Sequence, residues 1–258
     1  HLVHAKERRR EEGVEVMSLP LPTKRNEAWR YGDLDALARV WPQLDAPEKI
    51  VVAAGEAVSL VIERLEPVDG VAVRAIEAEL GAGARLDVYA LVCGADYGRL
   101  SVRVRLSEGA HFELGGAILG SGDQTLEIVT ETLHAEPNAT SHQVVRSVLG
   151  GRATGSFLGR IEVARHAQKT DAAQSVKAML LDRTATANAK PELEIYADDV
   201  KCAHGATVGE LDRMALFYMA SRGIDPAAAR RLMLQAFIAD ATAGGGEAIE
   251  AAALAVLE

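Results

Sequence analysis

Apolar and polar residues alternate in short segments through the middle of the chain. Residues 101–106, 125–128 and 193–196 each carry an apolar side chain at every second position. This period of two is the pattern of β-strands that bury one face. Turn-forming residues separate the segments at intervals of roughly ten residues. The pattern predicts a strand-rich core over residues 46–206, with buried side chains at Val102, Val104, Leu126, Ile128, Leu193 and Ile195.

Three architectures accommodate so many short strands without long intervening helices: a sandwich, a barrel and a parallel β-helix. The inward positions hold Val, Leu, Ile and Ala, whose modest sizes can stack from coil to coil, and this favours the β-helix. No exact internal repeat supports that choice. The pattern alone therefore leaves all three architectures open.

The N-terminal segment is predicted to be a helical arm over residues 1–45. It includes a charged, helix-compatible stretch at 5–12 and a rigid spacer at Pro20-Leu21-Pro22. Proline fixes its own φ and biases the preceding residue away from helix, so the spacer interrupts the arm. Trp29 and Tyr31 follow, and we expect their rings to pack the arm against the strands.

The C-terminal segment, residues 207–258, changes to a helical period and is predicted to be a separate helical subdomain. Its first helix ends at Gly223, and its second begins at Asp225 and Pro226, an N-cap residue followed by proline at the first helical position. A last helix is expected at 247–257. Apolar stripes run along the first two helices, through Leu211, Met214, Ala215, Phe217 and Tyr218 and then Ala229, Leu232, Met233, Ala236 and Phe237. A short helix pair cannot bury all of this surface, so some members should contact a partner.

Composition narrows the function classes. The net charge of −9 gives no support to nucleic-acid binding, which needs a basic surface. No apolar run approaches the roughly 20 residues that span a bilayer, and no signal peptide is evident. The two cysteines, Cys93 and Cys202, lack a disulfide or CxxC pattern, which fits a reducing cytoplasm. We interpret Cys93 as a core thiol.

The densest chemistry lies at residues 198–204, which contain two carboxylates, a thiol and an imidazole. In an extended strand Cys202 and His204 project from the same face, so both could reach one iron or one cluster. The alternative is structural, with Cys202 as a small buried hydrophobe and His204 as a hydrogen-bonded turn residue. Asp198 and Asp199 would point to opposite faces of a strand and so could not share acid–base work.

Other candidate sites are weak. His111, His134, His142 and His166 lack ligand spacing and are interpreted as surface or packing histidines. The phosphate-binding, serine-hydrolase and zinc-protease motifs are absent, so no enzyme class is indicated.

Longer stretches of the chain resemble one family, the SufB/SufD proteins of iron–sulfur cluster assembly. The resemblance rests on GSFLGRIEV at 155–163, AQKTDA at 167–172, PELEIYADDVKCAHGATVG at 191–209 and LFYMASRGI at 216–224. The segment LPTKRNEAWRY at 21–31 also resembles the N-terminal part of SufD. The KCxHGATVG form is more similar to SufD than to its paralogue SufB.

The resemblance implies a right-handed parallel β-helix between two helical parts. It implies a cytoplasmic scaffold, not an enzyme, that pairs with a SufB-like paralogue through the β-helix and binds a SufC-like ATPase. The ATPase would contact the C-terminal helices at Leu211, Phe217, Tyr218, Leu232 and Phe237. The isolated chain would form a homodimer.

The same resemblance attaches cluster assembly and metal binding to His204, with Cys202 as its neighbour. No tightly bound cofactor is implied, only transient iron or a nascent cluster shared with SufB. Two alternatives stay open. One is a purely architectural subunit in which both residues are structural. The other is an independent β-helix enzyme acting on polysaccharides, for which the chain has few aromatic sugar platforms.

Overall fold

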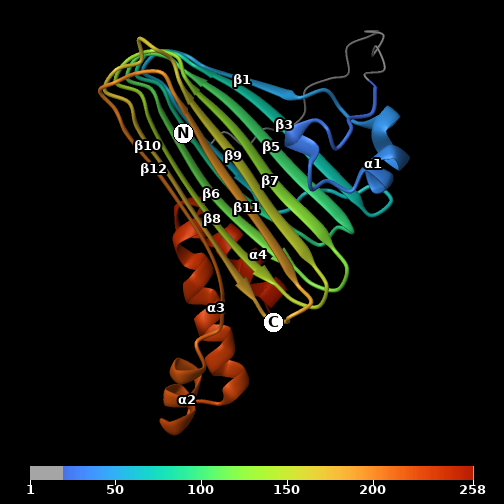
Figure 1. Ribbon diagram of the computed structural model, residues 1–258. Helices are drawn as coiled ribbons and strands as arrows, with labels where there is room; N and C mark the ends of the chain where they lie inside the picture. The colour runs from blue at the N-terminus through green and yellow to red at the C-terminus, as the bar shows by residue number, and fades with distance from the viewer. Residues whose placement is uncertain (1–19, 258) are drawn as a thin grey trace.

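The computed structural model describes residues 20–257, and its centre is a parallel β-helix of two facing sheets. Each coil gives one strand to each sheet, so twelve strands make six coils (Figure 1). Sheet A contains β1 (Glu48–Val52), β3 (Val71–Leu80), β5 (Tyr97–Leu106), β7 (Thr125–His134), β9 (Thr154–Val163) and β11 (Thr186–Ile195). Sheet B contains β2 (Ala57–Ile62), β4 (Arg85–Cys93), β6 (His111–Gly120), β8 (Thr140–Leu149), β10 (Asp171–Leu180) and β12 (Lys201–Glu210). The predicted β-helix with helices at both ends is confirmed.

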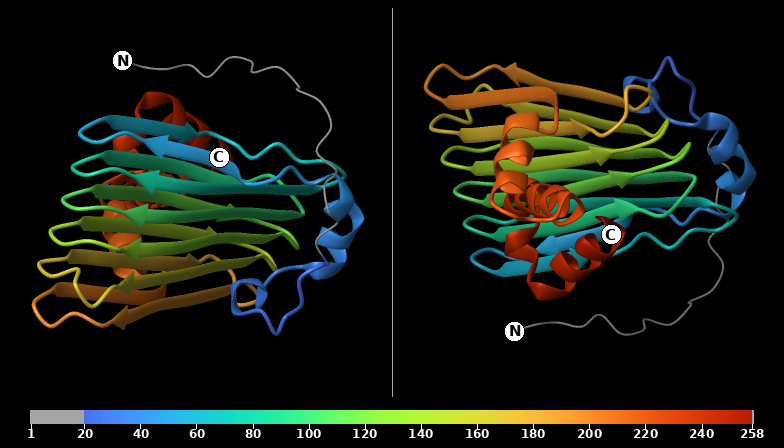
Figure 2. Two further views of the ribbon diagram at one scale, coloured as in Figure 1. Left: turned by 90° about the horizontal axis from the view of Figure 1, so that it is seen from above. Right: turned by 90° about the horizontal axis from the view of Figure 1, so that it is seen from below.

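Stacking in register explains why the alternating segments fold this way. Ile76, Val102 and Thr130 are paired partners on successive strands of sheet A, and Leu86 and Phe112 are paired on sheet B. Side chains of like position therefore form columns that face the other sheet, which is the usual source of stability in a repeat architecture. Figure 2 shows the coils lying one upon another, with the first coil at one end and the last at the other.

The predicted interior residues are correct in the middle coils and wrong at the end. Val102, Val104, Leu126 and Ile128 are buried. Leu193 is only half-buried, and Ile195 is 40% exposed. Both lie on β11, the terminal strand of sheet A, so no further coil covers them. Alternation gives the direction in which a side chain points but cannot tell that the stack has ended.

The N-terminal arm comprises the 3-10 turn η1 (Glu27–Trp29), helix α1 (Leu34–Val40) and the 3-10 turn η2 (Trp41–Gln43). Leu37 and Val40 of α1 pack with Val71 and Tyr97 against the first strands of sheet A. The ring of Trp29 packs there too and contacts Trp41 edge-on. Tyr31 is half-buried, beside the Arg30 side chain. The helix expected at 5–12 lies outside the described residues.

Three C-terminal helices follow the last strand: α2 (Arg213–Ser221), α3 (Pro226–Thr242) and α4 (Glu247–Leu257), with the 3-10 turn η3 (Ala243–Gly245) between the last two. As expected, Asp225 caps α3 and Gly223 has a positive φ after α2. The second half of α3 and all of α4 cover the outer face of sheet B, whereas α2 and the start of α3 project beyond the sheets (Figures 1 and 2). No helix within residues 20–257 is long and apolar enough to cross a membrane.

The buried helix face is fixed by one apolar cluster and one ion pair. Leu234 and Ile238 of α3 and Ile249 of α4 pack against residues of β4, β6 and β8, including the buried thiol of Cys93. Arg146 of β8 donates to Asp240 of α3 over 2.6 Å. Cys93 is therefore a core thiol, as predicted, and burial raises its pKa.

Candidate functional site

The last coil presents an unpaired edge of both sheets. Strands β11 and β12 each pair on one side only, with β9 and β10. Every residue of β12 is exposed except Cys202, which is half-buried. A ten-residue strand with an open edge is a template for pairing with another chain unless something blocks it.

The backbone hydrogen bonds show which groups point towards the open edge. The Lys201 N–H donates to the Thr170 carbonyl over 2.8 Å, so it points towards β10. Successive N–H groups of a strand point to opposite sides. The N–H groups of Cys202, His204, Ala206 and Val208 therefore point to the open edge.

The same reasoning places Pro191 on β11. The Thr186 N–H donates to the Ala153 carbonyl over 2.9 Å, so even-numbered residues of β11 bond to β9. Pro191 falls on the open side, where its missing N–H removes no bond of the sheet. This is the position in which a strand tolerates proline.

Cys202 lies at the inner corner of the last coil. Its paired partner on β10 is Ala172, and its side chain packs against a small cluster that includes Ile161, Val163 and Ala167. Burial raises the pKa of the thiol, the negative charge of Asp171 raises it further, and a backbone hydrogen bond involving Ala172 opposes them. The thiol is therefore protonated at neutral pH, and activation must come from a bound metal or a partner.

His204 occupies the next inward-facing position of β12. Its paired partner on β10 is Gln174, which is buried, but no coil lies above His204 and its side chain is exposed. The strand puts Cys202 and His204 on one face, as predicted. The hydrogen bonds of the described residues include none between them.

The donor set fits a shared site better than a resident one. Within residues 20–257 no group of three His, Cys, Asp or Glu side chains converges as a metal site. A structural metal needs about four ligands, so two donors at an open edge would need others from beyond the described residues. Asp198 and Asp199 do not add to the set, because they lie in the corner between β11 and β12, and Asp199 pairs with Lys169.

The other histidines have structural surroundings. His134 is fully buried and shares a hydrogen bond of 2.9 Å with Ser141. His111 and His142 lie on the outer face of sheet B and both contact Glu113, and His166 is exposed. Their interpretation as packing or surface residues stands.

The proposed partner-binding residues divide into two groups. Phe217, Tyr218 and Leu232 are exposed, by 69%, 58% and 49% respectively. Leu211 and Phe237 are half-buried against the cluster that joins α3 and α4 to sheet B. The exposed group lies on α2 and the start of α3, the part that projects from the sheets (Figure 1).

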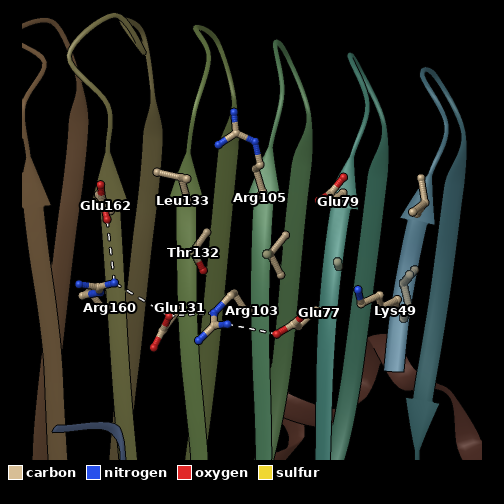
Figure 3. A pocket seen from close by; sticks show the side chains of 14 residues that line it. Lys49, Glu77, Glu79, Arg103, Arg105, Glu131, Thr132, Leu133, Arg160 and Glu162 are labelled. Carbon is tan, nitrogen blue, oxygen red and sulfur yellow. Dashed lines mark hydrogen bonds and ion pairs between the residues drawn. The ribbon is translucent and has the colours of Figure 1, made fainter. Parts of the chain in front are cut away.

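A groove on the outer face of sheet A is lined by charged side chains, several of which pair with one another. Arg103 lies 3.1 Å from Glu77 and 3.0 Å from Glu131, and Arg160 lies 3.9 Å from Glu131 (Figure 3). These side chains alternate in sign from coil to coil. Because Arg103 and Arg160 each have a carboxylate beside them, these side chains are better explained as a ladder of ion pairs than as a ligand site.

Sequence reasoning did not identify Gln143 and Gln174, which lie beneath His204 inside the β-helix. Both are buried polar residues at inward-facing positions. The signal was available, because each stands at an apolar position of the alternation.

Comparison with known proteins identifies a family for this chain. The family model described as "SUF system FeS cluster assembly, SufBD core domain" matches residues 47–237. The iron–sulfur cluster assembly protein SufD of Escherichia coli (strain K12) is 41% identical over 109 residues, which is 42% of this chain and 26% of that one. Protein ABCI7, chloroplastic, of Arabidopsis thaliana is 37% identical over 161 residues, 61% of this chain and 32% of its own length. SufD of Bacillus subtilis (strain 168) is 30% identical over 132 residues, 51% of this chain and 30% of that one.

The matched regions thus span about a third or less of these relatives' own length. The family model nevertheless matches more than half of the chain, including the coil that carries Cys202 and His204. The chain belongs to the SufBD family of SUF-system iron–sulfur cluster assembly proteins, and it resembles members named SufD.

Proposed function

We propose that this chain is a non-enzymatic scaffold subunit of a cytoplasmic SUF complex, in which its last coil pairs with a SufB-like paralogue. The observation that carries the proposal is the unpaired edge of β11 and β12, with Cys202 and His204 on the inner face of that coil. A partner strand added to this edge would cover both side chains and bring its own groups beside them.

In this proposal His204 and Cys202 lend two ligands to iron or a nascent cluster, and SufB supplies the rest. Imidazole and thiolate both suit iron. The raised pKa of the Cys202 thiol makes it the less ready ligand, because the thiol must lose its proton before it binds. Iron and sulfide are cargo here, and the chain needs no resident cofactor.

We also propose that a SufC-like ATPase binds the projecting helices. Phe217, Tyr218 and Leu232 supply exposed apolar surface on α2 and α3. Leu211 and Phe237 instead pack against the apolar cluster between sheet B and the helices α3 and α4. A patch of exposed aromatic and aliphatic side chains on a projecting element is typical of a protein-binding surface.

The test is cluster formation in the complex co-expressed with its SufB-like and SufC-like partners. His204→Ala should lower iron and acid-labile sulfide per complex several-fold, with partner retention and melting temperature unchanged. Cys202→Ser should have a smaller effect. His166→Ala is the matched control, since His166 is exposed and lies in the turn between β9 and β10, outside β12. If His204→Ala leaves the cluster yield unchanged, the subunit is purely architectural.

A further inference from the structure

A polar column interrupts the apolar interior of the β-helix below His204. Gln143 of β8 and Gln174 of β10 are successive paired partners on sheet B, and His204 is the next. Thr130 and Thr132 of β7 face them from sheet A. Both glutamines and both threonines are buried, with at most 3% exposure, so their polar atoms must satisfy one another.

In the structure the hydrogen bonds give each amide one orientation. The Thr130 hydroxyl donates to Gln143 Oε1 over 2.8 Å, and Gln143 Nε2 donates to Thr132 Oγ1 over 3.1 Å. Gln174 Nε2 donates to Gln143 Oε1 over 3.4 Å. With Gln143 turned this way, the opposite orientation of the Gln174 amide would bring two acceptor oxygens together, so the nitrogen faces Gln143.

This orientation leaves Gln174 Oε1 buried and without a hydrogen-bond partner. An unpartnered acceptor in the interior is costly, and a native structure keeps few of them. In a ladder of amides each oxygen accepts from the neighbouring rung on one side. The donor missing from Gln174 Oε1 should therefore come from the next rung, which is His204.

The opposite sheet makes room for this amide. Gly159 of β9 lies across from Gln174, and a Cβ added there would come within 2.5 Å of Gln174 Nε2. Any side chain at 159 would therefore displace this amide or the Phe157 ring, which lies equally close.

We infer that Gln174 is a positioning residue for His204. One N–H of the neutral imidazole donates to Gln174 Oε1, and the other ring nitrogen then presents its lone pair at the open end of the β-helix. No described hydrogen bond engages the exposed His204 side chain, so its ring can turn towards Gln174. Adjacent strands lie about 4.8 Å apart, which lets one rung reach the next.

This inference rests on the proposed function, and it specifies the tautomer and the ring orientation of His204. Neutral imidazole has two tautomers, and only the nitrogen without hydrogen can bind a metal. A hydrogen bond from the other nitrogen to an amide or carbonyl oxygen selects the tautomer and the ring orientation. The ring nitrogen of His204 that carries no hydrogen is then already oriented to bind Fe²⁺.

The test measures tautomer and metal binding separately. Full-length chain with ¹⁵N-labelled histidine reports the neutral tautomer of His204, whose signals are assigned by their loss in His204→Ala. Wild type should show one dominant tautomer, and Gln174→Leu a mixture of both. If Gln174→Leu does not fold, Gln174→Met makes the same comparison.

In the co-expressed complex, Gln174→Leu should weaken binding of Fe²⁺ alone about tenfold, the usual scale for the hydrogen-bond partner of a ligand. In a His204→Ala background it should change nothing further. Unaltered tautomer populations and Fe²⁺ affinity in Gln174→Leu would overturn the inference. If His204→Ala itself leaves Fe²⁺ binding unchanged, the proposed function loses its metal role, while the tautomer measurement still decides the part played by Gln174.

Discussion

Arg99 Nη1 lies 2.6 Å from Glu127 Oε2, and both side chains are buried between sheet A and the N-terminal arm. The Arg99 guanidinium also stacks on the Trp29 ring at 3.7 Å from its centroid and donates to the Ala28 carbonyl over 2.8 Å. The Tyr97 hydroxyl donates to the same carboxylate oxygen over 3.0 Å. One buried pair thus links two coils and the arm.

Removing one member of this pair should be costly. Arg99→Met leaves the Glu127 carboxylate buried without its cation, so the free energy of unfolding should fall by about 3–5 kcal/mol. The double variant Arg99→Met/Glu127→Leu should recover most of the loss. Arg103→Met, four residues further along β5 and exposed, should cost at most about 1 kcal/mol. Urea unfolding checks all three, and equal losses for Arg99→Met and Arg103→Met would contradict the account.

His134 should make stability depend on pH. Burial lowers the pKa of this histidine from 6.5 to about 4, against the effect of a backbone hydrogen bond involving Ala139. Between these values the unfolded chain binds more protons than the folded chain, so stability rises with pH. The contribution is fully present above pH 6.5 and is lost as the pH falls towards 4, by up to about 3 kcal/mol.

The check is denaturant unfolding of His134→Gln across that pH window. The variant should lose part of the pH slope, whereas His166→Gln, at an exposed position, should retain it. A wild-type slope in His134→Gln would show that other groups set the acid sensitivity.

Phe217 and Phe237 should respond differently to the same substitution. Phe217→Asp changes a side chain that is 69% exposed, so it should weaken ATPase binding at least tenfold and leave unfolding unchanged. Phe237→Asp places a charge against the cluster under α3 and should lower stability by about 2–4 kcal/mol. Pull-down and thermal unfolding of both variants decide the matter. If Phe217→Asp still binds the ATPase with unchanged affinity, the ATPase does not bind at Phe217.

Proline substitution can separate the edge of β12 from its internal pairing. Ala206→Pro removes an N–H that points to the open edge, so it should abolish pairing with the SufB-like partner at little cost in stability. Thr207→Pro removes an N–H that points towards β10 and should instead destabilise the last coil. Size-exclusion chromatography of the mixed chains reports the pairing. Full assembly by Ala206→Pro would exclude strand addition at this edge.

The fold was predictable from the sequence where local patterns decide it. Alternation gave the inward positions of the middle coils, and the Asp225-Pro226 and Gly223 signals gave the helix boundaries. The choice of a β-helix over a sandwich was not fixed by the pattern, because alternation does not say which strand pairs with which. That choice needed the family resemblance.

The site was only partly predictable. The spacing of Cys202 and His204 put them on one strand face, but their exposure depends on β12 being the last strand. Gln174 stands 30 residues earlier, and it is the paired partner of His204 because one turn of the β-helix brings β12 beside β10. Contacts between residues one turn of the β-helix apart depend on the length of that turn, so the residues adjacent in sequence do not reveal them.

The most direct test of the central claim is residue-resolved hydrogen exchange along β12, in the isolated chain diluted until it is a monomer and in the complex with the SufB-like partner. In the monomer the amides of Cys202, His204, Ala206 and Val208 should exchange fast, and those of the intervening residues, which bond to β10, slowly. In the complex all should be protected, while the open edge at β1 and β2 stays unchanged. Fast exchange at those four amides in a stable complex would contradict the claim that the last coil is the assembly edge.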